Sequence, residues 1–147
     1  MSNQAFKRDF AKLLARAGDK VDLVVRKTAL TLQSSMIEKS PVGNPSLWKD
    51  PSAAPPGYTG GRFRANWQAG LSAVNTDTSA QPGADAEGRT RVVLAGWKPG
   101  QTIFLTNSLP YSKKIEHGHS TQAPVGVVKL TVQDFHEAVA KAAREIR

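Results

Sequence analysis

The sequence has no cysteine and no long hydrophobic run, and both absences exclude whole classes of protein. Without cysteine there is no disulfide, thiolate zinc site, iron–sulfur cluster or cysteine nucleophile. The longest apolar runs, such as residues 92–95, are only a few residues long, whereas a bilayer span needs roughly 20. The first 17 residues scatter four basic side chains among apolar positions, unlike a cleaved signal peptide. We therefore expect an uncleaved, soluble chain that is made in the cytoplasm and has no membrane partner.

The length and the charge balance narrow the remaining classes. The chain has 147 residues, of which 39% are hydrophobic and 22% charged, so one folded domain over residues 1–147 is expected. Twenty Lys and Arg against twelve Asp and Glu give a net charge of +8. The excess is spread along the chain and no block of like charges occurs. A basic domain of this kind favours nucleic acid or an acidic protein surface as a neighbour.

Two stretches are predicted to be long loops. Residues 41–61 contain five prolines and four glycines, which remove backbone donors and permit unusual backbone angles. Residues 75–89 are small and polar and show no apolar periodicity. Both exceed the usual connection of about 4 to 6 residues. Long loops in a small domain are commonly explained by contact with a partner.

An amphipathic helix is predicted before the first loop, with an N-cap at Asp19. Its main apolar face consists of residues spaced three and four apart, namely Val21, Val24, Val25, Thr28, Leu32 and Met36. A second, narrow apolar stripe lies almost opposite and consists of Leu23, Leu30 and Ile37. This stripe needs a cover, either a further helix of the chain over residues 3–17 or a neighbouring subunit.

The rest of the chain predicts strands followed by helices. Strands are expected at residues 65–74, 89–95 and 102–107, because these segments are rich in β-branched and aromatic residues. A short helix is expected at residues 109–117 and a final helix within residues 124–146. The order predicts an α+β domain. In it, a small antiparallel sheet of three to four strands packs with a long N-terminal helix and a C-terminal helix.

Chemistry-bearing motifs are few. Glu116, His117 and His119 are the only cluster of potential metal ligands, but the spacing matches no zinc motif and a helix end explains it equally. Residues 59–64 contain a Gly-Gly pair before two arginines, yet the Lys-Ser/Thr pair of a phosphate-binding loop is absent. No nucleophile motif and no paired carboxylates are found. We therefore expect no enzyme activity, no cofactor and no metal.

Nucleic-acid binding is the second hypothesis that the residues support. Arg62, Arg64 and Trp67 form a basic and aromatic cluster that could face phosphates and bases. Trp67 is explained more simply as a core aromatic on a strand. No sequence-reading motif is present, so any contact with DNA would be electrostatic.

Three blocks of the sequence resemble the tail-completion or neck proteins of long-tailed bacteriophages, also described as phage tail-component proteins. The first is KSPVGNP at residues 39–45 with Leu47 and Trp48. The second is PPGYTGGRFRANWQ at residues 55–68. The third is LTNSLPYS at residues 105–112, which continues through IEHG at residues 115–118 to QAP at residues 122–124. The resemblance covers residues 20–146 in the right order.

The resemblance implies a virion structural protein with an α+β fold. Such proteins assemble as a ring between the DNA-filled capsid and the tail tube, and the tail terminator, connector stopper and adaptor are related types at this joint. It implies a homo-oligomer, a hexameric or dodecameric ring, with other neck, connector or tail-tube proteins and the passing genomic DNA as partners. The protein would be located in the virion neck or tail, after assembly in the host cytoplasm, and would have no catalytic residues.

The ring hypothesis gives a role to residues that the predicted fold does not require. Leu23, Leu30 and Ile37, together with Trp48 and Tyr58 of the proline-rich loop, are the candidate subunit contacts. Arg62 and Arg64 are the candidate source of positive charge at a DNA channel. The alternative is a free-standing, nonspecific nucleic-acid-binding protein.

Overall fold

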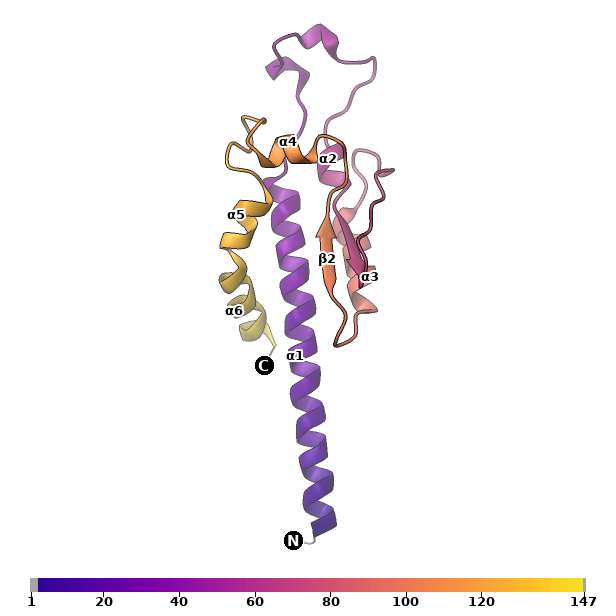
Figure 1. Cartoon of the computed structure of the whole chain (residues 1–147), viewed down its shortest axis with the longest axis vertical. Coiled ribbons are helices and arrows are strands. Elements are labelled where there is room, and N and C mark those ends of the chain that lie inside the picture. The colour runs from indigo at the N-terminus through magenta and orange to yellow at the C-terminus, as the bar shows by residue number, and fades with distance from the viewer. Residues whose placement is uncertain (1–2, 147) are drawn as a thin grey trace.

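The computed structural model describes residues 3–146, and its dominant feature is one long helix (Figure 1). α1 (Asn3–Lys39) has 37 residues and is therefore about 55 Å long. The expected break at Gly18 and Asp19, with a separate covering helix over residues 3–17, is wrong. The segment contains no proline, and a single mid-helix glycine costs only about 1 kcal/mol relative to alanine, so the helix continues through Gly18.

The body of the molecule is built around the C-terminal half of α1 (Figure 1). After α1 come two 3-10 turns, η1 (Pro45–Leu47) and η2 (Pro51–Ala53), then α2 (Arg62–Ala65), β1 (Gln68–Leu71), α3 (Ala86–Ala95), β2 (Ile103–Thr106), α4 (Ser112–Glu116), α5 (Val128–Gln133) and α6 (Phe135–Glu145). Helices α3, α5 and α6 pack directly on α1. The N-terminal half of α1 projects away from this body, and its side chains are almost all exposed.

The α+β class is confirmed, but the sheet is smaller than predicted. Among the described residues it has two antiparallel strands, with Gln68 opposite Thr106 and Leu71 opposite Ile103. The expected third strand at residues 89–95 is α3. Its β-branched residues suggested a strand, yet Val92 is 77% exposed while Thr90 and Leu94, four residues apart, are buried. That spacing is helical.

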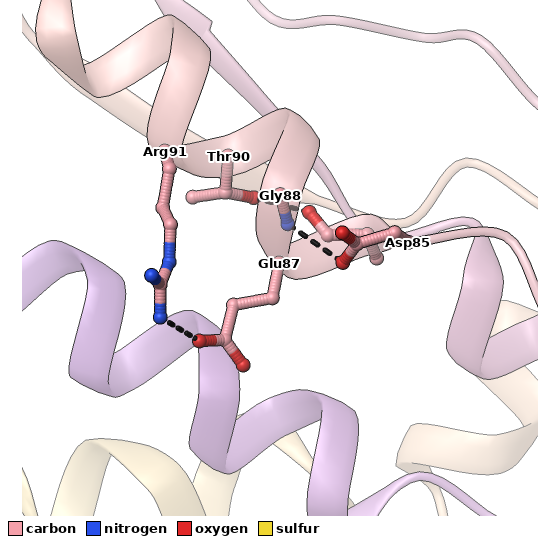
Figure 2. A network of polar contacts seen from close by, with 6 residues as sticks. Asp85, Glu87, Gly88, Thr90 and Arg91 are labelled. Carbon is pink, nitrogen blue, oxygen red and sulfur yellow. Dashed lines mark hydrogen bonds and ion pairs between the residues drawn. The ribbon is translucent and has the colours of Figure 1, made fainter.

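The N-terminus of α3 explains why this segment forms a helix and not the predicted strand (Figure 2). The Asp85 carboxylate accepts a hydrogen bond from the Gly88 amide at 2.8 Å, which satisfies one of the amides that a helix start leaves unpaired. One turn later, Glu87 and Arg91 form an ion pair at 2.6 Å with the helical spacing of four. The second predicted loop, residues 75–89, therefore ends before Ala86 and not at Arg89.

The predicted final helix is two helices. α5 ends and α6 begins at Asp134, whose carboxylate pairs with Lys39 of α1 at 2.7 Å. Ala138 and Ala142 of its predicted apolar face are buried, but Phe135, which the sequence placed on the same face, is 45% exposed. At the far end of α6, Glu145 pairs with Lys27 at 3.0 Å. The two ion pairs join both ends of α6 to α1.

The main core lies where the end of α1 meets α2, α4 and α5. Its buried members are Met36, Phe63, Trp67, Ala86, Leu109, Ile115, Ala123 and Val127. Trp67 is the core aromatic that the sequence suggested, although it lies just before β1 and not inside a strand. Its indole nitrogen donates to the Ser40 hydroxyl at 2.7 Å, and Ser40 donates to the Met36 carbonyl at 2.6 Å.

Asn66 holds the second loop against the body. It is fully buried, and its amide nitrogen donates to the carbonyls of Arg62 at 2.8 Å and Ala80 at 2.9 Å. Its side-chain oxygen accepts from the Ala80 amide at 3.1 Å. One buried side chain therefore satisfies three backbone groups that would otherwise be unpaired.

Replacing Asn66 tests this role. We expect Asn66→Ala to lower the free energy of unfolding by about 2–3 kcal/mol, because it leaves buried backbone groups without partners. Urea denaturation followed by circular dichroism measures the change. The matched control is Asn44→Ala, which removes an exposed cap of η1 and should change stability by less than about 1 kcal/mol. Equal effects of the two variants would contradict the assignment.

Candidate functional site

An open hollow of about 720 Å³ lies beside the proline-rich segment of residues 41–60, which we call the excursion. The excursion, α2, α4 and the segment before α5 contribute to its wall. Aromatic rings dominate one side: Trp48 and Tyr58 meet edge to face at 5.1 Å, and Tyr111 lies 6.2 Å from Phe63. The predicted contact residues Trp48 and Tyr58 therefore face this hollow together.

The excursion is fixed in place by close backbone contacts. Its two ends lie so close that a Cβ on Gly60 would collide with the carbonyl of Gly43, and one on Gly43 would collide with the Tyr58 hydroxyl. The Gln122 side chain pairs with both backbone groups of Val42, accepting at 3.0 Å and donating at 2.8 Å. The rings at the hollow are therefore held by a closed segment and not by a free loop.

The hollow is electropositive. Lys49, Arg62 and His119 line it, and no carboxylate does. Among the described residues, neither Lys49 nor Arg62 has an ion-pair partner. Burial raises the pKa of the Tyr111 phenol, although nearby Arg62 acts in the opposite direction, so this ring stays neutral at pH 7. The arrangement suits an anionic group that also presents a flat or apolar surface.

The two arginines predicted to act together are separated by the fold. Both belong to α2, but Arg62 lines the hollow whereas Arg64 does not. The guanidinium of Arg64 instead donates to the Ser40 carbonyl at 3.5 Å. The sequence had suggested that the two arginines form one basic cluster with Trp67. Helical geometry turns them apart.

The stripe of Leu23, Leu30 and Ile37 is not one continuous exposed surface. Leu23 is exposed, Leu30 lines a groove shared with α3 and α6, and Ile37 packs partly buried against the main core. The chain itself therefore covers the C-terminal end of this stripe, and only Leu23 is exposed to a neighbour.

An apolar surface on α5 was missed in the sequence. Val125, Val128, Val132 and Phe135 are all exposed, with Val132 at 63%, and we call these four residues the α5 strip. Only Val128 and Val132, four residues apart, belong to α5, whereas Val125 precedes Gly126 in a turn and Phe135 begins α6. The prediction of one helix within residues 124–146 gave α5 no face of its own.

The Glu116 carboxylate, which precedes His117 and His119 in the sequence, has a structural role. Glu116 accepts hydrogen bonds from the amides of Val127, Val128 and Lys129, each at 2.9 Å, and so caps α5. Gly126, at φ +92°, is required there, because a Cβ would lie 2.5 Å from the Glu116 carbonyl. Within residues 3–146, no three His, Asp or Glu side chains are placed to hold a metal ion.

Comparison with known proteins gives no relative. No family model matches the chain, and neither a curated protein nor a solved structure does. In the part of the chain that the structure describes, no helix has both the length and the apolar character needed to cross a membrane.

Glu116 gives a test through its titration. Burial opposes ionisation of Glu116, but the three amide donors outweigh it and lower its pKa below the usual 4.5. A carboxyl whose folded pKa is depressed stabilises fully above the unfolded value, and the contribution is lost as pH falls through the folded value. Glu116→Gln should therefore cost about 1–2 kcal/mol at pH 7.

The pH profile separates this cap from a general acid effect. The stability difference between the native chain and Glu116→Gln should stay constant above about pH 5 and shrink toward pH 3. Denaturation at a series of pH values measures it. Glu137→Gln, which removes an exposed carboxylate paired at 3.6 Å, is the control and should have little effect. A difference for Glu116→Gln that does not vary with pH would refute the cap.

Proposed function

We propose that this protein is a non-enzymatic virion structural protein that forms a ring at the head–tail joint or tail top of a long-tailed bacteriophage. In that role it completes the tail and joins it to the DNA-filled capsid. The observation that carries the proposal is the presence of two separate exposed apolar surfaces on one small chain: the α5 strip, and the excursion with Leu47 and Tyr58.

Two different surfaces are what a ring subunit needs. In a ring each copy contacts its neighbours through two unlike patches, and the rotation between copies closes the assembly. The α5 strip lies on α5 and the residues at its two ends, whereas the excursion projects from the body (Figure 1) and carries an exposed Leu47. The projection of one copy would meet the strip of the next around a hexamer or dodecamer.

The blocks that resemble the phage family support the proposal because their side chains are used to build the fold. Asn66 and Trp67 make the buried hydrogen bonds described above, and Asn107 donates to the Phe63 carbonyl at 2.7 Å. Asn107 also accepts from the Ser112 hydroxyl at 3.2 Å. These motif residues hold backbone segments of the fold together.

The net charge of +8 fits a subunit that surrounds DNA. Repeated around a ring, it would make a basic collar that attracts phosphates without reading sequence. The expected partners are further copies of the chain, other neck, connector or tail-tube proteins, and the genomic DNA that passes through. The expected location is the virion neck or tail.

Charges placed on the α5 strip should prevent ring formation. Val128→Asp with Val132→Asp puts two carboxylates into an apolar contact, so we expect rings to be lost while the fold is retained. Negative-stain images of the assembled protein measure this. Val92→Asp, at a more exposed valine on α3, is the matched control and should still assemble.

Images of phage particles test the role itself. Particles assembled without this protein should appear as tailless heads beside free tails if it acts at the joint, or as abnormally long tails if it terminates the tail. The α5 double variant should fail to rescue them, whereas Val92→Asp should rescue. If the protein is absent from mature virions, the proposal is wrong.

The basic hollow favours nonspecific nucleic-acid binding as a second function. Aromatic rings with nearby cations are the elements that bind single strands, by stacking on bases and attracting phosphates. Arg62→Ala should then weaken binding of a single-stranded oligonucleotide about threefold or more in a salt-dependent manner. Arg64→Ala, on the same helix but outside the hollow, should change binding little. Equal losses from both variants, measured by fluorescence anisotropy, would indicate diffuse charge and no site.

A further inference from the structure

The N-terminal half of α1 is an apolar helix without a cover. We call residues 3–24 the arm. Phe6, Phe10, Leu13 and Val21 are each about half exposed or more, from 49% to 62%. Phe6 and Phe10 stack on each other at 5.9 Å, with no other described ring beside them. Because most helical stability in proteins comes from packing of an apolar face, a partner on this uncovered side would stabilise the arm.

The exposed apolar stripe of the arm continues along α1 into a stretch where the same helix face is buried by the rest of the chain. Phe6, Phe10, Leu13, Ala17, Val21 and Val24 follow one another in steps of four and three that average the helical repeat. Thr28, the next position on this line, is buried in the body. α6 ends where Glu145 pairs with Lys27, and the chain terminus lies beside the middle of α1 (Figure 1). Beyond that point, no described residue covers this line of α1.

We propose that the arm of a second copy of this chain provides that helix, so that free protein is a dimer with antiparallel arms. In this pairing Phe6 faces Val21 of the other copy and Phe10 faces Ala17, which sets each large side chain against a smaller one. Leu13 lies at the two-fold axis. The contact is self-complementary, as a two-fold interface must be.

Charge fits the antiparallel direction. One flank of the stripe carries Asp9, Lys12, Arg16 and Lys20, and the opposite flank carries Lys7 and Asp22. Antiparallel helices bring like flanks together, so Asp9 of each copy faces Arg16 and Lys20 of the other, and Lys7 faces Asp22. Each pairing occurs twice.

The opposite flank contains Ala11, Leu14 and Gly18, and a Cβ added at Gly18 would meet nothing within 4 Å in this chain. Gly18 thus lowers helix stability with no reason inside one subunit. The four large apolar side chains would bury roughly 400 Å² per copy, about half of the roughly 800 Å² per partner of a standard interface.

The oligomeric state of the full chain tests the proposal, independently of any role in a virion. Sedimentation equilibrium should show a dimer, and Leu13→Asp should raise its dissociation constant at least about tenfold. Phe10→Asp should act in the same way, while Val92→Asp leaves the dimer intact. Circular dichroism confirms that each variant folds. The proposal is overturned by a native chain that is monomeric at about 100 µM, or by a dimer that survives both arm variants.

Disulfide trapping tests the direction, and the chain contains no cysteine to interfere. Phe6→Cys mixed with Val21→Cys should give a disulfide between the two variants, and Phe6→Cys alone should give none. A disulfide between two Phe6→Cys copies would mean a parallel pair and would overturn the proposal. Asp9→Arg should weaken the dimer, and adding Arg16→Asp should restore it. Binding of the monomer to vesicles of acidic lipid, with no dimer, would assign the arm to a membrane surface and reject the pairing.

Discussion

The hydrogen bond from the Trp67 indole to the Ser40 hydroxyl is the contact on which the layout depends. It joins the last turn of α1 to the residue that leads into β1, and both groups are buried, so neither has water as an alternative partner. The excursion starts at the very next residue, Pro41. Its direction of departure, and hence the position of the hollow, follows from where this bond holds the end of α1.

The wall of the hollow is also held in place by hydrogen bonds between segments that are distant in the sequence. Arg62 and Phe63 belong to a helix of four residues, too short to be stable alone. The helix is held by side chains from distant segments: Asn107 bonds to the Phe63 carbonyl, and the Arg89 guanidinium bonds to the Ala65 carbonyl. A site built this way keeps its geometry before a partner arrives, which lowers the ordering cost of binding.

The sequence predicted elements whose signal is local and missed those that depend on context. The long amphipathic helix, two of the strands and both loops follow from periodicity and from proline content. The prediction of a third strand was wrong because it relied on the β-branched residues at 92 and 93. It overlooked the helix N-cap at Asp85, whose carboxylate accepts from an amide three residues away. Arg62 and Arg64 could not be separated without knowing that they lie on a helix. The α5 strip was missed because the side chains that stay exposed depend on which face of α5 packs against α1.

Solubility before assembly and close contact after it place opposite demands on one surface. A net charge of +8 keeps free copies apart over about 10 Å at 0.1 M salt, whereas apolar contacts act only between copies that already touch. A subunit with two unlike apolar patches forms open filaments if the rotation between copies fails to close. Pairing of the arms would cover the largest exposed rings first. The excursion and the α5 strip would then remain available as apolar contacts for a ring, so the order of assembly would depend on which surface is already covered.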